Sequence, residues 1–173
     1  MTNISTFEIN EPLDMHLHLR DGDMLGLVGP LTSETFSGAL VMPNLVPPIT
    51  TKEDLLSYKQ RINAVCKEDK FEPYLTLFFK NDYSYEFLED IKKDIIGIKL
   101  YPAGITTNSE TGVSSMDVEV LRPTLESMSK LGIPLCIHGE TNGFVMDREK
   151  EFMPIYESLA KAFPNLKIIM EHI

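Results

Sequence analysis

Residues 14–20 of this 173-residue chain read DMHLHLR, in which polar and apolar side chains alternate and two histidines lie two positions apart. In a β-strand, successive side chains point to opposite faces, so His16, His18 and Arg20 would share one face. Two imidazoles at this spacing can converge on one metal ion, and imidazole suits zinc among other first-row metals. The alternative is a pair of polar side chains packed in the protein interior.

The rest of the chain alternates short apolar runs with amphipathic segments. Strand followed by helix, repeated, indicates a parallel sheet with crossover helices. Residues 23–35 form a less regular segment that we expect Gly29-Pro30 to break. Thr50, followed three residues later by Glu53, predicts a capping box at the start of the next helix. The expected strands are 13–19, 39–42, 74–79, 95–100, 133–138 and 167–173, and the expected regular helices are 51–67, 84–93, 117–131 and 148–163.

Two parallel-sheet architectures compete for this pattern, an open doubly wound sheet and a closed barrel. No Gly-x-Gly-x-x-Gly follows the first run and no phosphate-binding P-loop occurs, so nucleotide-binding open sheets lose support. A TIM-type (β/α)8 barrel has eight strands and typically about 250 residues. We therefore expect residues 1–173 to form a single α/β barrel domain that is incomplete at its C-terminal side, with about the first six strands present.

The remaining two histidines support the metal hypothesis. His138 and His172 each lie at the C-terminal end of an apolar run, which is the end of a parallel barrel where active sites are built. A single histidine there is more often structural, but all four histidines of the chain fall at such ends with consistent inward parity. Cys136 shares the face of His138 one layer deeper, and we expect it to belong to the core.

Lys99 lies inside the apolar run over 95–100. Burial lowers the pKa of a lysine, and a neutral amine can react with carbon dioxide to form a carbamate. A carbamate is an anionic oxygen ligand that can bridge two metal ions. The alternative is an exposed lysine at a strand end, or one that snorkels outward.

The composition of the chain limits the classes of molecule that it is expected to bind. The net charge is -10 and no basic cluster occurs, which argues against nucleic acid, whose binding depends on neutralising phosphates. No apolar run of about 18 residues predicts a membrane span. Cys66 and Cys136 form no CxxC pair and no signal-peptide pattern is present, so we expect reduced thiols in a cytoplasmic protein. An anionic substrate would need local cations to overcome the overall negative charge.

Five short motifs resemble those of the dihydroorotases, a family of the amidohydrolase superfamily. Their order and spacing together are specific, and the resemblance is closest to the compact bacterial type, whose barrel starts almost at the N-terminus. It covers essentially the whole chain. The motifs are HLHLRDG at 16–22, MPN at 42–44, KLYPAG at 99–104 followed by TTNS at 106–109, IHGE at 137–140 and EHI at 171–173.

The resemblance implies a binuclear zinc site. His16 and His18 would bind the more buried Zn2+, N6-carboxylated Lys99 would bridge two Zn2+ ions, and His138 and His172 would bind the second. On the substrate side it implies Arg20, Asn44 and His138. A guanidinium forks naturally onto a carboxylate, which fits Arg20 as a carboxylate-binding residue. Thr106 and Thr107 lie in a loop that closes over the substrate in relatives; the alternative is an ordinary flexible connection.

The implied reaction is the reversible cyclisation of N-carbamoyl-L-aspartate to (S)-dihydroorotate, a step of de novo pyrimidine biosynthesis. The family's general acid/base is an aspartate at the end of strand 8, which we expect beyond Ile173, so no catalytic residue is assigned within this chain. Asp14 lies deeper and is expected to be structural. The alternatives are another cyclic-amide hydrolase, similar to hydantoinases or allantoinases, and an inactive metal-binding fragment. The full-length protein is expected to be a homodimer, and residues 1–173 alone to be inactive.

Overall fold

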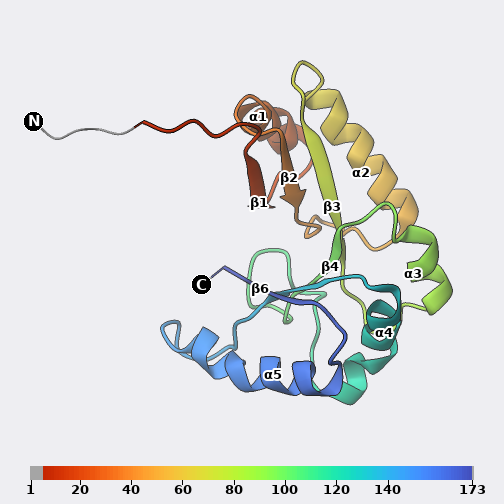
Figure 1. The fold of residues 1–173 in the computed structure, drawn as a ribbon. Helices are drawn as coiled ribbons and strands as arrows, with labels where there is room; N and C mark the ends of the chain where they lie inside the picture. Colours follow the sequence, from red (N-terminus) through yellow and green to blue (C-terminus); the bar gives the residue numbers. More distant parts are fainter. Residues whose placement is uncertain (1–5, 173) are drawn as a thin grey trace, which may run out of the picture.

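The computed structural model describes residues 6–172, which form one six-stranded sheet (Figure 1). All strand pairs are parallel, and the strands follow one another in the sheet in their order along the chain, β1-β2-β3-β4-β5-β6. The predicted parallel, barrel-type arrangement of six strands is confirmed. The strands are β1 (Leu13–Leu17), β2 (Gly38–Val41), β3 (Glu72–Phe78), β4 (Gly97–Leu100), β5 (Leu135–His138) and β6 (Ile168–Glu171).

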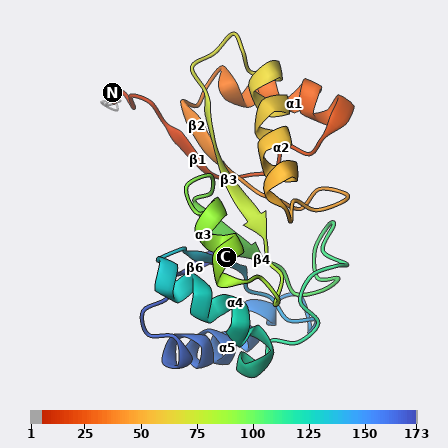
Figure 2. The ribbon, with the colours of Figure 1, turned by 90° about the vertical axis from the view of Figure 1, so that its right-hand side faces the viewer.

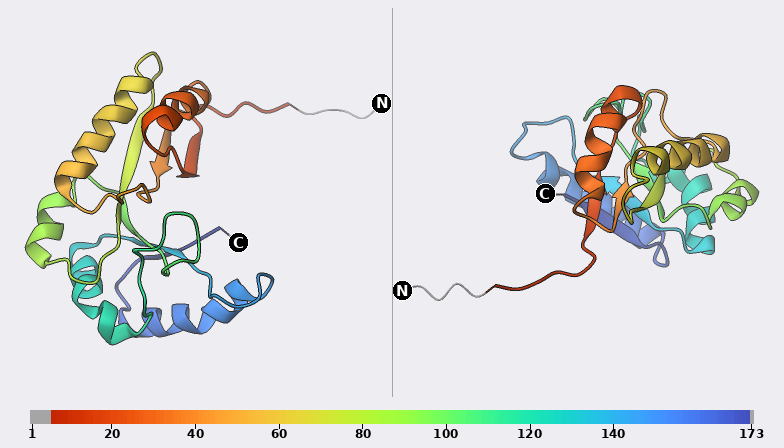
Figure 3. Two further views of the ribbon diagram at one scale, coloured as in Figure 1. Left: turned by 180° about the vertical axis from the view of Figure 1, so that it is seen from behind. Right: turned by 90° about the horizontal axis from the view of Figure 1, so that it is seen from above.

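Five helices connect the strands and cover one side of the curved sheet, so that the described residues form an open half-barrel (Figure 3). Figure 2 shows β1–β3 with α1 and α2 in one part and β4–β6 with α3–α5 in the other, joined through the pairing of β3 with β4. Within residues 6–172, no helix has the length and apolarity needed to cross a membrane. The helices are α1 (Gly22–Ser33), α2 (Lys52–Val65), α3 (Tyr85–Ile91), α4 (Val118–Leu131) and α5 (Arg148–Ala162).

Strand alternation divides the buried side chains into two layers, as β4 illustrates. Ile98 and Leu100 belong to the hydrophobic core that the sheet forms with the helices, together with Leu121 and Leu125 of α4. Lys99 alternates with them and therefore faces the concave side, where it is nevertheless fully buried. The helix-facing layer stabilises the fold, whereas the concave layer carries the polar residues of the candidate site.

The two outer strands of the described sheet each pair with only one neighbour. β1 pairs with β2 and β6 with β5, and both outer strands carry exposed apolar side chains. Exposed apolar edges of this kind template further strand pairing. The exposed side chains are Leu13, Met15, Ile169 and Met170.

The expected break at Gly29-Pro30 is wrong, because α1 runs through Pro30 to Ser33. Proline costs the helix one hydrogen bond and crowds the carbonyl four residues earlier. Leu25, Gly29 and Ser33 form a buried stripe, and a side chain on Gly29 would approach Val65 of α2 to 2.9 Å. Close packing of the two helices therefore outweighs the local cost of the proline.

The cap of α2 is also corrected by one residue. The N-cap is Thr51, whose hydroxyl accepts a hydrogen bond from the Asp54 backbone N–H at 3.1 Å and donates to the Asp54 carboxylate at 2.7 Å. The motif is therefore displaced from the predicted pair Thr50 and Glu53. Adjacent threonines followed by adjacent acidic residues offer the same pattern in two registers, and the sequence pattern alone does not choose between them.

Thr51→Ala should destabilise the protein by about 1 kcal/mol, because it leaves a backbone donor of the first helical turn without its cap. Thr50→Ala is the matched control and should change the free energy of unfolding by less than about 0.5 kcal/mol, as is usual for a substitution away from such features. Urea denaturation of the full-length protein measures both. Equal effects of the two substitutions would contradict the assigned cap.

Candidate metal centre

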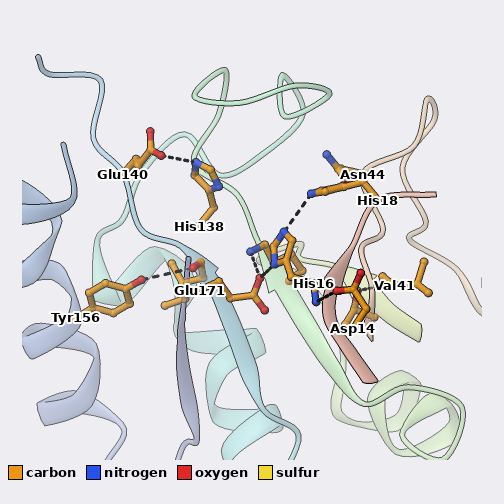
Figure 4. Close-up of polar contacts among 12 residues, drawn as sticks. Asp14, His16, His18, Val41, Asn44, His138, Glu140, Tyr156 and Glu171 are labelled. Carbon is orange, nitrogen blue, oxygen red and sulfur yellow. Dashed lines mark hydrogen bonds and ion pairs between the residues drawn. The ribbon is translucent and has the colours of Figure 1, made fainter. Parts of the chain in front are cut away.

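The four histidines gather at the C-terminal ends of β1, β5 and β6, and Figure 4 shows His16, His18 and His138. His16 lies in β1 and His138 ends β5, while His18 and His172 lie just beyond β1 and β6. The ring centroids of His16 and His18 are 5.0 Å apart, those of His16 and His172 5.1 Å, and those of His138 and His172 4.6 Å. Residues from both ends of the chain thus form one cluster of imidazoles.

The facing nitrogens of His16 and His18 have the separation that a shared metal ion requires. Their Nε2 atoms are 3.1 Å apart. Two imidazole nitrogens that each lie about 2.05 Å from one ion would be separated by this distance at an angle of about 100°, close to tetrahedral. Burial, reinforced by the charge of Arg20 and by His16, lowers the pKa of His18 to about 4. His18 is therefore neutral at pH 7, which is the form that binds metals.

His138, like His18, is kept in its neutral form by burial. Burial, with the neighbouring His172 adding to it, lowers the pKa of His138 to about 4. Its Nε2 is buried without a hydrogen-bond partner among the described residues and lies 3.4 Å from a carboxylate oxygen of Glu140. Glu140 in turn lies 3.6 Å from a guanidinium nitrogen of Arg148. A buried imidazole nitrogen without a partner costs free energy, so it calls for a group that this structure does not contain.

Lys99 is fully buried, so the alternative of an exposed or outward-snorkelling lysine does not hold. Its ammonium nitrogen lies 2.6 Å from Glu171 Oε2, which is 4% exposed. Burial lowers the pKa of Lys99, and the Glu171 carboxylate partly opposes this effect. The lysine thus lies on the concave face, in contact with the Glu171 carboxylate that also approaches His16.

Glu171 is a site residue that the sequence analysis did not single out. Its carboxylate approaches both Lys99 Nζ, at 2.6 Å, and His16 Nδ1, at 2.5 Å, the latter without hydrogen-bond geometry. Figure 4 shows Glu171 beside His16. Burial alone would raise its pKa, but the neighbouring His16 and Lys99 lower it to about 2. The sequence offered one signal, a carboxylate within the apolar run of β6, but the pairing of Glu171 with His138 is seen only in the structure.

Both Glu171 and His172 turn toward the site because β6 ends between them. Strict alternation would have sent them to opposite faces. The strand stops at Glu171, and His172 takes a positive φ of 24°, so its backbone leaves the pleat. His172 is exposed and also lies near Glu140 and Glu149, with one ligand atom from each residue within 4.8 Å of the others. The expected inward parity of His172 therefore depends on a turn and not on the strand.

The donor set fits a metal ion. It consists of the imidazoles, of which His18 and His138 are kept neutral by burial, of two buried imidazole nitrogens without hydrogen-bond partners among the described residues, and of a buried amine beside a carboxylate. Imidazole together with carboxylate-type oxygen is the ligand chemistry of zinc and related divalent metals. Asp14 is not free to join this set, because its Oδ1 accepts a hydrogen bond from the His16 backbone N–H at 2.9 Å.

The expected substrate-binding residues gather beside His18. Asn44 follows β2 and is 2% exposed, and its Oδ1 lies 2.8 Å from His18 Nδ1. Its amide nitrogen donates to the carbonyl oxygen of Thr107 at 2.9 Å, and Arg20 Nη1 lies 3.5 Å from the Asn44 carbonyl oxygen. The structure therefore brings Arg20, Asn44 and Thr107 together, next to the imidazole pair.

The loop after β4 has an internal structure of its own. Ser109 is fully buried, accepts a hydrogen bond from the Thr106 N–H at 3.0 Å and donates to the Thr106 carbonyl oxygen at 2.6 Å. Asn108 takes a positive φ of 56° and donates from its side chain to the Asn44 carbonyl oxygen at 3.1 Å. Thr106 thus stabilises the loop turn, and Thr107 and Asn108 attach the loop to Asn44.

Comparisons with known proteins were made for the whole chain. No protein-family model matches it. A dihydroorotase from Helicobacter hepaticus is 46% identical over 169 residues, covering 97% of this chain and 49% of the relative. The crystal structure of a dihydroorotase from Campylobacter jejuni superposes with a TM-score of 0.92 at 60% identity, covering 98% of this chain and 51% of that one. An L-hydantoinase from Arthrobacter aurescens matches with a TM-score of 0.72 at 16% identity, covering 94% of this chain and 41% of that one, and shows the fold alone.

The six parallel strands with alternating helices form a half-barrel, the fold that the chain shares with the matched dihydroorotase and hydantoinase structures. The chain is homologous to the dihydroorotases over nearly its whole length, which confirms the resemblance found in the sequence motifs. The chain spans about half the length of the curated relatives it matches.

Lys99→Met and Glu171→Gln should each destabilise the metal-free protein by about 3 to 5 kcal/mol, because each leaves the other group buried without its counter-charge. The double variant should cost less than the sum, since it removes both charges together. Denaturant unfolding of the full-length protein measures this cycle. Strictly additive effects would show that the 2.6 Å pair contributes no coupling.

Proposed function

We propose that this chain provides six of the eight strands of a complete (β/α)8 barrel domain, and that the full-length protein is a dihydroorotase. The proposed reaction is the reversible cyclisation of N-carbamoyl-L-aspartate to (S)-dihydroorotate in pyrimidine biosynthesis. The observation that carries the proposal is the pair of His16 and His18 nitrogens, 3.1 Å apart beside the fully buried Lys99. The 60% identity with the Campylobacter jejuni dihydroorotase supports it.

Two zinc ions are the proposed cofactor. His16 and His18 would hold one ion, His138 and His172 the other, and carboxylated Lys99 both. When bound, the metals would supply Lewis acidity and a water made nucleophilic at neutral pH. The buried Lys99 amine supports carboxylation, because its lowered pKa favours the neutral form that reacts with carbon dioxide. Glu171 would then have to give up its contact with the Lys99 nitrogen.

The proposed substrate carries a carboxylate, and Arg20 with Asn44 would bind it. An amide nitrogen has two hydrogens. Asn44 uses its Nδ2 in the bond to Thr107, which leaves the second hydrogen for a carboxylate oxygen. Arg20 supplies the local positive charge that a chain of net charge -10 must offer an anion. The buried His138 and the loop of Thr106 and Thr107 would contact the remainder of the substrate.

Proton transfer requires a further group. Among the described residues Asp14 Oδ1 accepts the His16 backbone N–H, and Glu171 pairs with Lys99. The resemblance to dihydroorotases implies instead an aspartate at the end of strand 8 as general acid/base, and we propose that it lies beyond Ile173. A homodimer in the cytoplasm is the proposed state of the complete protein.

The complete protein, supplied with zinc and bicarbonate, should turn over dihydroorotate and N-carbamoyl-L-aspartate, but hydantoin and allantoin at least about 100-fold more slowly, because the latter lack the carboxylate for Arg20. Native mass spectrometry should show the added mass of one carbon dioxide and two zinc ions. Turnover of hydantoin or allantoin in preference to dihydroorotate would replace the proposal with a different cyclic-amide hydrolase. Zinc binding without turnover of any of them would leave a metal-binding scaffold.

Arg20→Met should lower kcat/KM for dihydroorotate by about 10- to 100-fold, because a hydrogen bond to a charged group contributes about 1.5 to 3 kcal/mol net of its exchange with water. Arg122→Met, on the outer surface of α4 where Arg122 pairs with Glu119, is the matched control and should keep the original rate. Zinc content should be unchanged in both variants. An unaltered rate in Arg20→Met would remove Arg20 from the carboxylate site.

A further inference from the structure

Asn44 stands out because its side-chain oxygen, its amide nitrogen and its backbone carbonyl all make polar contacts within the buried site. Its side-chain oxygen contacts His18 Nδ1 at 2.8 Å, and its amide nitrogen donates to the Thr107 carbonyl at 2.9 Å. Its backbone carbonyl accepts from Asn108 Nδ2 at 3.1 Å and lies 3.5 Å from Arg20 Nη1. A residue whose only role was to grip a substrate would not need to be held from four directions.

The contact with Thr107 determines which way the Asn44 amide points. A backbone carbonyl can only accept a hydrogen bond, so the group that faces it must be the NH2 group. The side-chain oxygen therefore faces His18 Nδ1, 2.8 Å away. Because that oxygen can only accept, Nδ1 of a neutral His18 must carry the hydrogen.

The tautomer of His18 follows from this orientation. With its hydrogen on Nδ1, the imidazole presents the lone pair of Nε2 toward His16 Nε2, 3.1 Å away. Metal-binding histidines characteristically donate their other ring N–H to an oxygen, which fixes both the tautomer and the ring orientation. Asn44 Oδ1 occupies the position of that oxygen.

We propose that Asn44 is a positioning residue for His18 as a metal ligand, and that it ties the orientation of that ligand to the loop over 106–109. The inference rests on the proposed metal site but not on the identity of the substrate. It assigns Asn44 a role that precedes substrate binding, since the amide is oriented by Thr107 before any carboxylate arrives. Displacing the loop would free the amide to rotate and so loosen the metal ligand.

Two substitutions distinguish the role of the Asn44 side-chain oxygen from that of its NH2 group. Asn44→Ala removes both, and should weaken zinc binding at the site of His16 and His18 by about 10 to 100-fold, the usual cost of losing such a partner. Asn44→Asp keeps an oxygen for His18 Nδ1–H, and should restore zinc affinity. Asn108→Ala removes only a loop contact to the Asn44 backbone, and should leave zinc affinity as in the original protein.

The measurements are made on the full-length protein. Zinc affinity is determined by competition with a chelator, and the tautomer of His18 by 15N NMR of the metal-free, histidine-labelled protein. In the original protein and in Asn44→Asp, Nδ1 of His18 should carry the hydrogen, whereas Asn44→Ala should show a mixture of tautomers. Should Asn44→Ala fail to fold, the comparison of Asn44→Asp with the original protein decides, and a 10-fold loss of zinc affinity there would overturn the proposal.

Other outcomes are equally decisive. Original zinc affinity and an unchanged His18 tautomer in Asn44→Ala would overturn the positioning role, whatever the catalytic rate. A protein that binds zinc in the manner described but does not turn over dihydroorotate would instead overturn the proposed function and leave this inference standing. The two can therefore fail separately.

Discussion

The burial of Lys99 is the constraint on which the concave side of this half-barrel depends. An ammonium group removed from water costs several kcal/mol unless a counter-charge meets it, and Glu171 does so at 2.6 Å. That carboxylate also approaches His16, so one pair of buried charges links β4, β6 and β1. Around it the imidazoles of His18 and His138 stay neutral, because burial and nearby positive groups disfavour their protonation. The concave side therefore contains buried imidazole nitrogens, on His16 and His138, that have no hydrogen-bond partner among the described residues.

Much of the fold could be predicted because burial imposes simple periods on the sequence. All six strands and the regular helices lie where apolar runs and amphipathic segments indicate, with ends that differ by a few residues. The errors have local causes. Pro30 continues α1 because Gly29 allows close packing on α2, and the choice between Thr50 and Thr51 as cap depends on backbone geometry that a pattern does not contain. Contacts between distant elements override local preference at such points.

The candidate site was predictable to the extent that it follows strand parity. Three of the histidines and Lys99 converge as alternation indicates, whereas the inward turn of His172 results from the end of β6 and a positive φ. Glu171 escaped notice because its partner across the sheet is known only once the register is. The bond between Asn44 and Thr107 joins residues 63 positions apart through a loop whose shape depends on the buried Ser109. The hydrophobic periodicity of a sequence cannot predict such a contact, although the motif resemblance had indicated both Asn44 and Thr107 as site residues.

The position of His16 against His172 has a consequence for the order in which the molecule assembles. The ring centroids of these two residues are 5.1 Å apart, yet one lies in the first described strand and the other just past the last. A growing chain that has completed only β1 can offer a metal two imidazoles, but the full set of donors exists only after every intervening strand has taken its place. An ion held at this junction would therefore link the first and the last of the strands that the structure describes.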